Sequence, residues 1–265
     1  MKRMARSRKA DPPSERIKVG TCGFAMRRQE YYQTFPVVEI QQSFYKLPRV
    51  TTGERWRAAA PPGFEFTMKA WQLITHEPSS PTYRRLGKPI PPEAKGRYGA
   101  FRPTDEVFAA WAQTRAFADA LGATIIVFQC PPRFTPTPEH IANLRTFFST
   151  IDRTGWRAAW EPRGAWTSDL VRGLCEDLDL IHVVDPLKET ALYGAIRYFR
   201  LHGLTGYRYV HTDQDLQRLA AACQPDLPTY CLFNNIFMAE DAVRFRELLG
   251  LQLEVVRGRS VKAGH

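Results

Sequence analysis

The chain has 265 residues, 44% of them hydrophobic and 24% charged, so it can bury a large core in one α/β domain or in two small ones. No apolar run approaches the roughly 20 residues that span a bilayer, and no apolar segment follows the basic N-terminus, which argues against a membrane protein or a secretory signal. The five cysteines are scattered and form no CxxC pair, a pattern typical of reduced thiols in a cytoplasmic protein rather than of a zinc site.

The formal net charge of +10 is concentrated at the two ends of the chain. Residues 1–10 contribute +5 and residues 257–265 contribute +3, so the part between them carries only +2. We therefore expect a disordered basic arm at 1–15, one barrel domain at 16–250 and a basic C-terminal tail at 251–265. Such ends either bind phosphate polymers loosely or carry solvated charge without a function, and the sequence leaves both interpretations open.

Eight short apolar runs follow the arm, and several are hydrophobic at nearly every position, as in strands buried on both faces of a parallel sheet. They lie at 17–21, 37–41, 64–69, 124–129, 157–161, 181–185, 197–202 and 229–234. Segments between them predict helices at 52–60, 105–121, 139–151, 168–178, 213–223 and 239–249. We expect helix capping by Thr104, Asp105, Pro138, Ser168, Asp169 and Asp213. This alternation predicts a TIM-like (β/α)8 barrel, with an open doubly wound sheet as the alternative.

Two segments depart from a regular barrel. Between Asp185 and Arg197 there are too few residues for a crossover helix, so we expect a degenerate unit after the sixth strand. Residues 71–103 contain six prolines, carry a net charge of +4 and form one long excursion after the third strand. Long irregular loops inside compact domains tend to be lids or binding loops.

Polar side chains stand at the carboxyl end of almost every predicted strand, which is where (β/α)8 barrels place their chemistry. Glu39 and Glu161 come from the second and fifth strands, and His202 follows the seventh. We expect these three to be catalytic, because two carboxylates in different surroundings can act as general acid and base, with the imidazole as a proton carrier. The predicted substrate-binding residues are Tyr45, Lys69, His76, Gln129, Arg163, Trp166, Asp185, Arg200, Asn234 and Asn235.

These residues also have a structural interpretation. Glu39 could pair with Lys69 or Arg200 inside the barrel, and Arg200 could form an internal salt bridge with Glu161. The remaining polar groups could stabilise turns, and the aromatic side chains could pack in the core. The sequence leaves open whether the set forms a site or a structural network.

The chain resembles the domain of unknown function 72 (YecE-like) family in seven stretches between Ile17 and Leu249. In order they are IKVGTCGF, VEIQQSFYKLP, FTMKAWQLITH, VFQCPPRF, EPRGAW, FRLHG and LFNN. The resemblance implies a TIM-like barrel and no established activity. The matching positions are Gly20, Gly23, Glu39, Phe44, Tyr45, Lys69, His76, Gln129, Glu161, Arg163, Trp166, Arg200, His202, Gly203, Asn234 and Asn235. The departures from the family pattern, at Cys22, Phe24, Gln41, Gln42, Cys130 and 162–165, imply a substrate different from that of relatives.

Three functions follow from these observations. The first is a hydrolase or lyase acting on a phosphorylated or sugar-containing compound, with Glu161 as acid or base and Glu39 as its partner. The second is a nucleic-acid-processing enzyme, a nuclease or a base-excising enzyme, which would hold the phosphate backbone with the basic arm and the 71–103 loop. The third is a non-catalytic binding barrel in which the charged set is structural.

The sequence predicts no particular cofactor. A divalent metal would find hard ligands in Glu39, Glu161, Asp185 and His202, although no motif requires one. The expected partner is an anionic small molecule or a nucleic acid, with no membrane, and the oligomeric state is left open.

Overall fold

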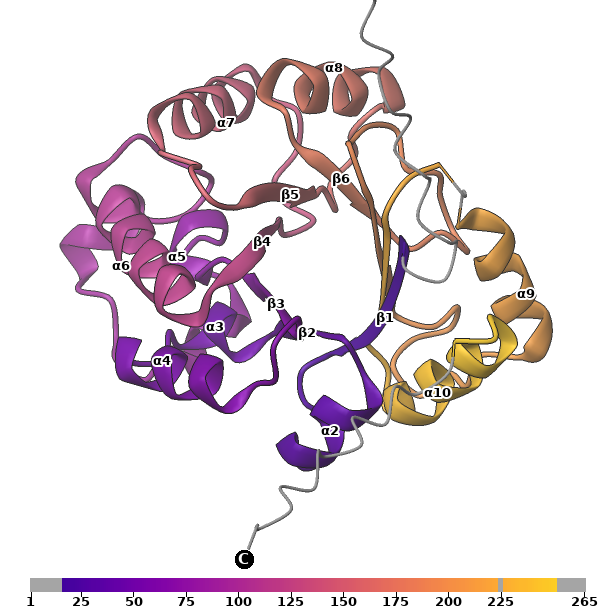
Figure 1. Cartoon of the computed structure of the whole chain (residues 1–265). Helices are drawn as coiled ribbons and strands as arrows, with labels where there is room; N and C mark the ends of the chain where they lie inside the picture. The colour runs from indigo at the N-terminus through magenta and orange to yellow at the C-terminus, as the bar shows by residue number, and fades with distance from the viewer. Residues whose placement is uncertain (1–15, 224–225, 252–265) are drawn as a thin grey trace, which may run out of the picture.

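The computed structural model describes residues 16–223 and 226–251, which form a closed barrel of eight parallel strands surrounded by helices (Figure 1). The strands are β1 (Ile17–Cys22), β2 (Val37–Ile40), β3 (Glu65–Lys69), β4 (Ala123–Gln129), β5 (Arg157–Glu161), β6 (Ile181–Val184), β7 (Arg197–Leu201) and β8 (Thr229–Phe233). The predicted TIM-like barrel is confirmed, and the open sheet is wrong because β1 pairs with β8. The predicted arm, and all of the predicted tail except Leu251, lie outside the described residues.

The strands are apolar runs because both of their faces are covered. β2, β3, β6 and β8 are buried at every position, with one face inside the barrel and the other under the helices. An apolar layer fills the middle of the barrel. At the N-terminal end of the strands, the Glu65 carboxylate accepts hydrogen bonds from Lys18, Thr124 and Tyr230 and closes that end.

Helices connect most of the strands. They are α2 (Arg28–Thr34), α3 (Gln42–Tyr45), α4 (Val50–Ala59), α5 (Gln72–Thr75), α6 (Asp105–Leu121), α7 (Pro138–Thr150), α8 (Ser168–Leu178), α9 (Asp213–Ala222) and α10 (Met238–Leu248). The six predicted helices correspond to α4 and α6 to α10. The helices α2, α3 and α5 were not predicted, because α2 buries only Tyr31 and the other two are single turns too short to show a helical period.

Threonine side chains cap four of these helices. The Oγ1 atoms of Thr104, Thr137, Thr167 and Thr212 accept hydrogen bonds from backbone N–H groups three residues ahead, at the starts of α6, α7, α8 and α9. The prediction of Thr104 is confirmed. The other predicted caps lie inside the first turn and are wrong, namely Asp105, Pro138, Ser168, Asp169 and Asp213. Proline and acidic residues are favoured in that turn for other reasons, the missing N–H and the helix dipole.

Both predicted irregular segments are present. Residues 185–196 join β6 to β7 without a helix. Residues 71–103 contain α5 and the short 3₁₀ helices η1 (Pro81–Arg85) and η2 (Pro92–Arg97). This excursion packs onto the barrel, since Arg102 pairs with Glu77 at 2.6 Å and Leu86 is buried. Both segments leave from the carboxyl ends of strands, so they border the end of the barrel where the predicted site lies.

Candidate functional site

A buried guanidinium stands at the centre of the mouth of the barrel, the end formed by the carboxyl ends of the strands. Arg200 of β7 is 1% exposed. Its Nη2 and Nε atoms donate to the two carboxylate oxygens of Glu39 at 3.0 and 3.1 Å, and Nη1 donates to Glu161 Oε2 at 2.5 Å. Burial opposes the charge, but the two carboxylates outweigh it and raise the pKa of Arg200 well above its ordinary value. Arg200 is therefore a permanent cation that joins β2, β5 and β7.

Glu39 is enclosed in this network. Its side chain is fully buried, both oxygens accept hydrogen bonds from Arg200, and Tyr198 donates one more from its hydroxyl group at 2.9 Å. The Tyr198 hydroxyl is fixed in turn by Thr67 at 2.7 Å. Because no surface of Glu39 is open to the mouth, its geometry supports the structural interpretation, in which it holds Arg200 rather than contacting a substrate.

Glu161 is paired with two arginines. In addition to Arg200, it accepts hydrogen bonds at Oε1 from the Nε and Nη2 atoms of Arg163, at 3.0 and 2.7 Å. Burial alone would raise the pKa of Glu161, but Arg200 and Arg163 outweigh it and lower the pKa to about 2. Glu161 is therefore a carboxylate at neutral pH and has no proton to donate as a general acid.

His202 is held in one tautomer by its neighbours. Its Nδ1 atom lies 3.0 Å from the Arg200 carbonyl oxygen, which can only accept, so Nδ1 carries the proton. Its Nε2 atom consequently accepts a hydrogen bond from Arg163 Nη2 at 2.9 Å. Burial and the charge of Arg200 lower the pKa of His202 to about 3, so the ring is neutral at pH 7.

A second group of predicted residues lies beside Arg200. Gln129 Oε1 accepts hydrogen bonds from Lys69 Nζ at 2.9 Å and from Arg200 Nη1 at 3.2 Å. The Lys69 ammonium group also lies 3.9 Å from the centre of the Phe44 ring. Burial and the nearby Arg200 cation lower the pKa of Lys69 to about 7, and burial with Lys69 lowers that of His76 to about 3.

A cavity of about 300 Å³, here called the mouth cavity, opens at the ends of β5, β6 and β7. Its lining includes five charged residues and one histidine, namely Glu161, Arg163, Asp185, Lys188, Glu189 and His202. The sequence analysis missed Glu189, which follows no strand end but lies in the crossover without a helix. Glu189 is exposed at the rim of the cavity, where desolvation by its surroundings and then the charges of Glu161 and Asp185 raise its pKa. No residue in the described part of the chain forms an ion pair or a side-chain hydrogen bond with Glu189.

Asp185 and Lys188 complete the polar wall of the mouth cavity. Asp185 accepts backbone hydrogen bonds from Leu187 and His202 at 3.2 and 3.3 Å. Burial nevertheless raises its pKa. Lys188 Nζ donates to the Gly203 carbonyl at 2.9 Å and lies 3.9 Å from Asp185. These bonds hold the 185–189 turn against the end of β7.

The remaining predicted binding residues lie apart from the Arg200 network. Asn234 accepts a hydrogen bond from Gln41 at 3.1 Å. Asn235 donates to Asp241 of α10 at 2.7 Å, and Trp166 donates to the Phe134 carbonyl at 2.7 Å. Tyr45 belongs to a separate groove next to α4. Asn235 and Trp166 thus make structural contacts, which leaves their predicted contact with a substrate without geometric support.

The four hard ligands proposed for a metal do not form a metal site. Glu39 and Glu161 face the Arg200 guanidinium, Asp185 accepts two backbone N–H groups, and His202 Nε2 faces Arg163. Among residues 16–223 and 226–251, no group of three or more His, Cys, Asp or Glu side chains could hold a metal ion. These residues therefore do not fit a divalent metal in this arrangement.

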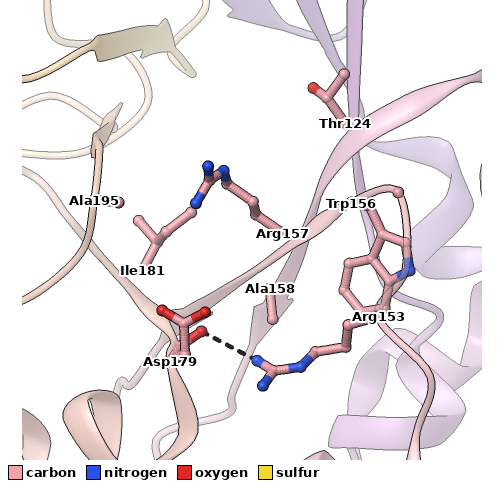
Figure 2. A pocket seen from close by; sticks show the side chains of 9 residues that line it. Thr124, Arg153, Trp156, Arg157, Ala158, Asp179, Ile181 and Ala195 are labelled. Atoms are coloured by element: carbon pink, nitrogen blue, oxygen red, sulfur yellow. Dashed lines mark hydrogen bonds between the residues drawn. The ribbon is translucent and has the colours of Figure 1, made fainter.

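A larger cavity, of about 510 Å³, lies at the opposite end of the strands (Figure 2). Figure 2 shows Arg153 hydrogen-bonded to Asp179, and Arg153 Nη1 donates to the Asp179 and Leu178 carbonyl oxygens at 3.1 and 2.7 Å. This end of a (β/α)8 barrel contributes to stability rather than to catalysis. The bonds of Arg153 agree with that role, so we place the candidate site at the mouth.

Comparisons with known proteins place the chain in a family. Residues 22–263 match the family described as protein of unknown function DUF72. The chain belongs to this family. UPF0759 protein YunF of Bacillus subtilis (strain 168) is 29% identical over 118 residues, which is 44% of this chain and 36% of that protein. The resemblance inferred from the sequence motifs is thereby confirmed.

The DUF72 barrel is also found among solved structures. A DUF72 family protein from Enterococcus faecalis V583 has a TM-score of 0.67 at 17% identity, over 89% of this chain and 96% of that chain. A xylose isomerase domain containing protein from Salmonella typhimurium LT2 has a TM-score of 0.58 at 11% identity, over 90% and 97%. At such identities the likeness shows the fold alone, an α/β TIM barrel. Within the described residues, no helix has the length and apolar character needed to cross a membrane.

Proposed function

We propose that this DUF72 protein is an enzyme, a hydrolase or lyase that acts by general acid and base catalysis on a phosphorylated or sugar-containing compound bound in the mouth cavity. One observation carries the proposal. Glu189 places a carboxyl group of raised pKa in a polar cavity, and no partner in the described chain neutralises it. Perturbed titratable groups in a cleft are typical of catalytic sites.

Two cations of the mouth cavity are placed to contact an anionic group of the substrate. Three carboxylates, of Glu161, Asp185 and Glu189, face the cations of Arg163 and Lys188. The side chains of Arg163 and Lys188 are 33% and 44% exposed, so each can turn toward a phosphate or carboxylate group. A bound anion would raise the pKa of Glu189 further, which favours its protonated form.

This arrangement assigns a different role to each group. Glu189 donates its proton to the leaving oxygen as the substrate bond breaks; in hydrolysis, water gives its hydroxide to the other fragment and its proton back to Glu189. Arg163 and Lys188 hold the anionic group. Glu161 and His202 position Arg163 through its guanidinium. The acid–base role predicted for Glu161 thus passes to Glu189, and Glu161 keeps a positioning role.

The experiment compares Glu189→Gln with the wild-type protein on a panel of phosphorylated sugars and other phosphate esters, and follows product formation by NMR. We expect Glu189→Gln to lower kcat by about 100-fold or more with little change in melting temperature. Glu176→Gln, an exposed site on α8, is the matched control and should leave kcat unchanged. Full activity in Glu189→Gln would refute the role of Glu189, and no turnover of any compound would favour the non-catalytic binding barrel.

A further inference from the structure

A second polar hollow lies at the mouth end of the barrel, on the side of β2 and β3. We call it the basic groove; its volume is about 680 Å³. It is lined by Gln42, Tyr45, Lys46, Leu47, Pro48, Arg49, Thr51, Thr52, Arg55 and Arg85. α3, α4 and the link 46–49 between them supply nine of these residues, and η1 adds Arg85 from the 71–103 excursion. Its volume is in the range of small-molecule sites, about 300–1,000 Å³.

The charge of the basic groove is uncompensated. Four of its lining residues are cations, Lys46, Arg49, Arg55 and Arg85, and none is acidic. All four are exposed, and none forms an ion pair with an acidic side chain in the described part of the chain. Some other surface arginines are paired, as in Arg145 with Asp177 at 2.6 Å. Four unpaired cations around one hollow repel one another, so an anion bound there would relieve that repulsion.

An ordered aromatic platform forms one wall of the basic groove. The Arg85 guanidinium lies 3.5 Å from the centre of the Tyr45 ring. Tyr45 packs edge to face against Phe44 at 5.0 Å, and Phe44 is buried under the Lys69 ammonium group. Tyr45 is thus fixed from inside the barrel, and Arg85 is stacked on it. Planar guanidinium and aromatic groups are surfaces on which nucleobases stack.

From these features we propose that the basic groove binds a nucleotide unit, with its phosphate on Lys46, Arg49 and Arg55 and its base against the Arg85–Tyr45 platform. Guanidinium groups bind phosphate and carboxylate oxygens alike, but three neighbouring cations match the charge of a phosphate monoester, about −1.5 to −2, better than the single charge of a carboxylate. The nucleotide unit is either a free mononucleotide or part of a nucleic-acid strand, since both present the same phosphate and base. The proposal is independent of turnover in the mouth cavity, because the groove and the mouth cavity share no lining residue.

The test measures binding of two probes, adenosine 5′-monophosphate by calorimetry and a fluorescein-labelled oligoadenylate of about 12 nucleotides by anisotropy. The variant is Arg49→Gln/Arg55→Gln in the full chain. The control is Arg145→Gln/Arg157→Gln, which removes the same charge from α7 and from the N-terminal end of β5. Both pairs are exposed, and a thermal melt of each variant verifies folding.

We expect the groove variant to bind at least about tenfold more weakly for each lost contact, and the control within about twofold of wild type. Binding of the mononucleotide identifies a free nucleotide as the ligand. Binding of the oligonucleotide alone identifies a strand, and the variant should then reduce the dependence of log K on log salt concentration by about one per lost phosphate contact. No binding of either probe at about 50 mM salt, or equal losses in both variants, would overturn the proposal.

Discussion

Replacing Arg200 by Met should destabilise the protein severely, and the reason lies in the carboxylates that it leaves behind. Glu39 is fully buried and would lose its ion pair, keeping only the hydrogen bond from Tyr198. Glu161 would keep Arg163 at 2.7 Å. Removing one partner of a buried ion pair costs about 3–5 kcal/mol, and since Glu39 alone is left without a cation, we expect a loss in this range rather than twice it. That loss corresponds to a fall in melting temperature of about 6–20 °C.

The stability lost in Arg200→Met should depend on pH, and the lowered pKa of Glu161 sets the direction. The pKa of Glu161 is lowered to about 2 in the folded protein, below its ordinary value of 4.5. A carboxyl group with a lowered folded-state pKa stabilises the protein above its unfolded pKa, and that contribution disappears as the pH falls from about 4.5 toward 2. In Arg200→Met, Glu161 keeps only one of the two arginines that lower its pKa, so the variant has less of this contribution to lose in acid. The difference between wild type and variant should therefore be largest at pH 7 and should narrow below pH 4.5.

Urea unfolding followed by tryptophan fluorescence at pH 7 and at about pH 4 measures both effects. The matched control is Arg145→Met, which breaks an ion pair whose side chains are 47% and 50% exposed. Such a surface pair contributes at most about 1 kcal/mol. If Arg200→Met cost no more than Arg145→Met, or if its deficit did not shrink in acid, the account of Arg200 as the buried counter-ion of two carboxylates would be refuted.

Two further variants test local features of the same structure. Because burial and Arg200 lower the pKa of Lys69 to about 7, the unfolded chain binds more protons than the folded one between pH 7 and 10, so this group makes stability rise with pH. Denaturant titrations of wild type and Lys69→Met should therefore show the free energy of unfolding of wild type rising by about 1–2 kcal/mol relative to the variant between pH 7.5 and 9. If the difference between the two proteins stayed constant over this range, the pKa of Lys69 would not be lowered. Thr212→Ala removes the capping box of α9 and should cost about 1 kcal/mol in the same titrations, and no loss would argue against the box.

The fold could be predicted from the sequence because barrel strands are covered on both faces. That double burial turns strands such as β3 and β8 into short apolar runs that are visible without any alignment. The helix-capping residues were harder to predict from the sequence. Thr137, Thr167 and Thr212 each precede a better-known capping or N1 residue, and only the backbone shows which one remains outside the helix.

The sequence predicted where the candidate site lies, but not which of its side chains pair with one another. Glu39, Glu161 and Arg200 stand at strand ends, and the barrel brings them together as expected. Which charges cancel depends on side-chain distances of a few tenths of an ångström, and these are not encoded in a spacing. Glu189 escaped notice because it belongs to no strand. The basic groove also escaped, since Lys46, Arg49, Arg55 and Arg85 are scattered over 40 residues of the sequence.

The barrel fold is shared with distant proteins, whereas the ion pairs of Arg200 depend on the side chains of this particular chain. Xylose isomerase-like proteins share the barrel at 11% identity, which carries the fold alone. In this chain Arg200 pairs with carboxylates of β2 and β5, and Arg163 also pairs with Glu161, so the acid of the mouth cavity without an ion pair in the described chain is Glu189. Under the proposed function, turnover depends on Glu189 and stability depends on Arg200. Glu189→Gln should therefore lose activity, and Arg200→Met should lose stability in the unfolding assay. If both variants lost stability, the two residues would belong to one structural network.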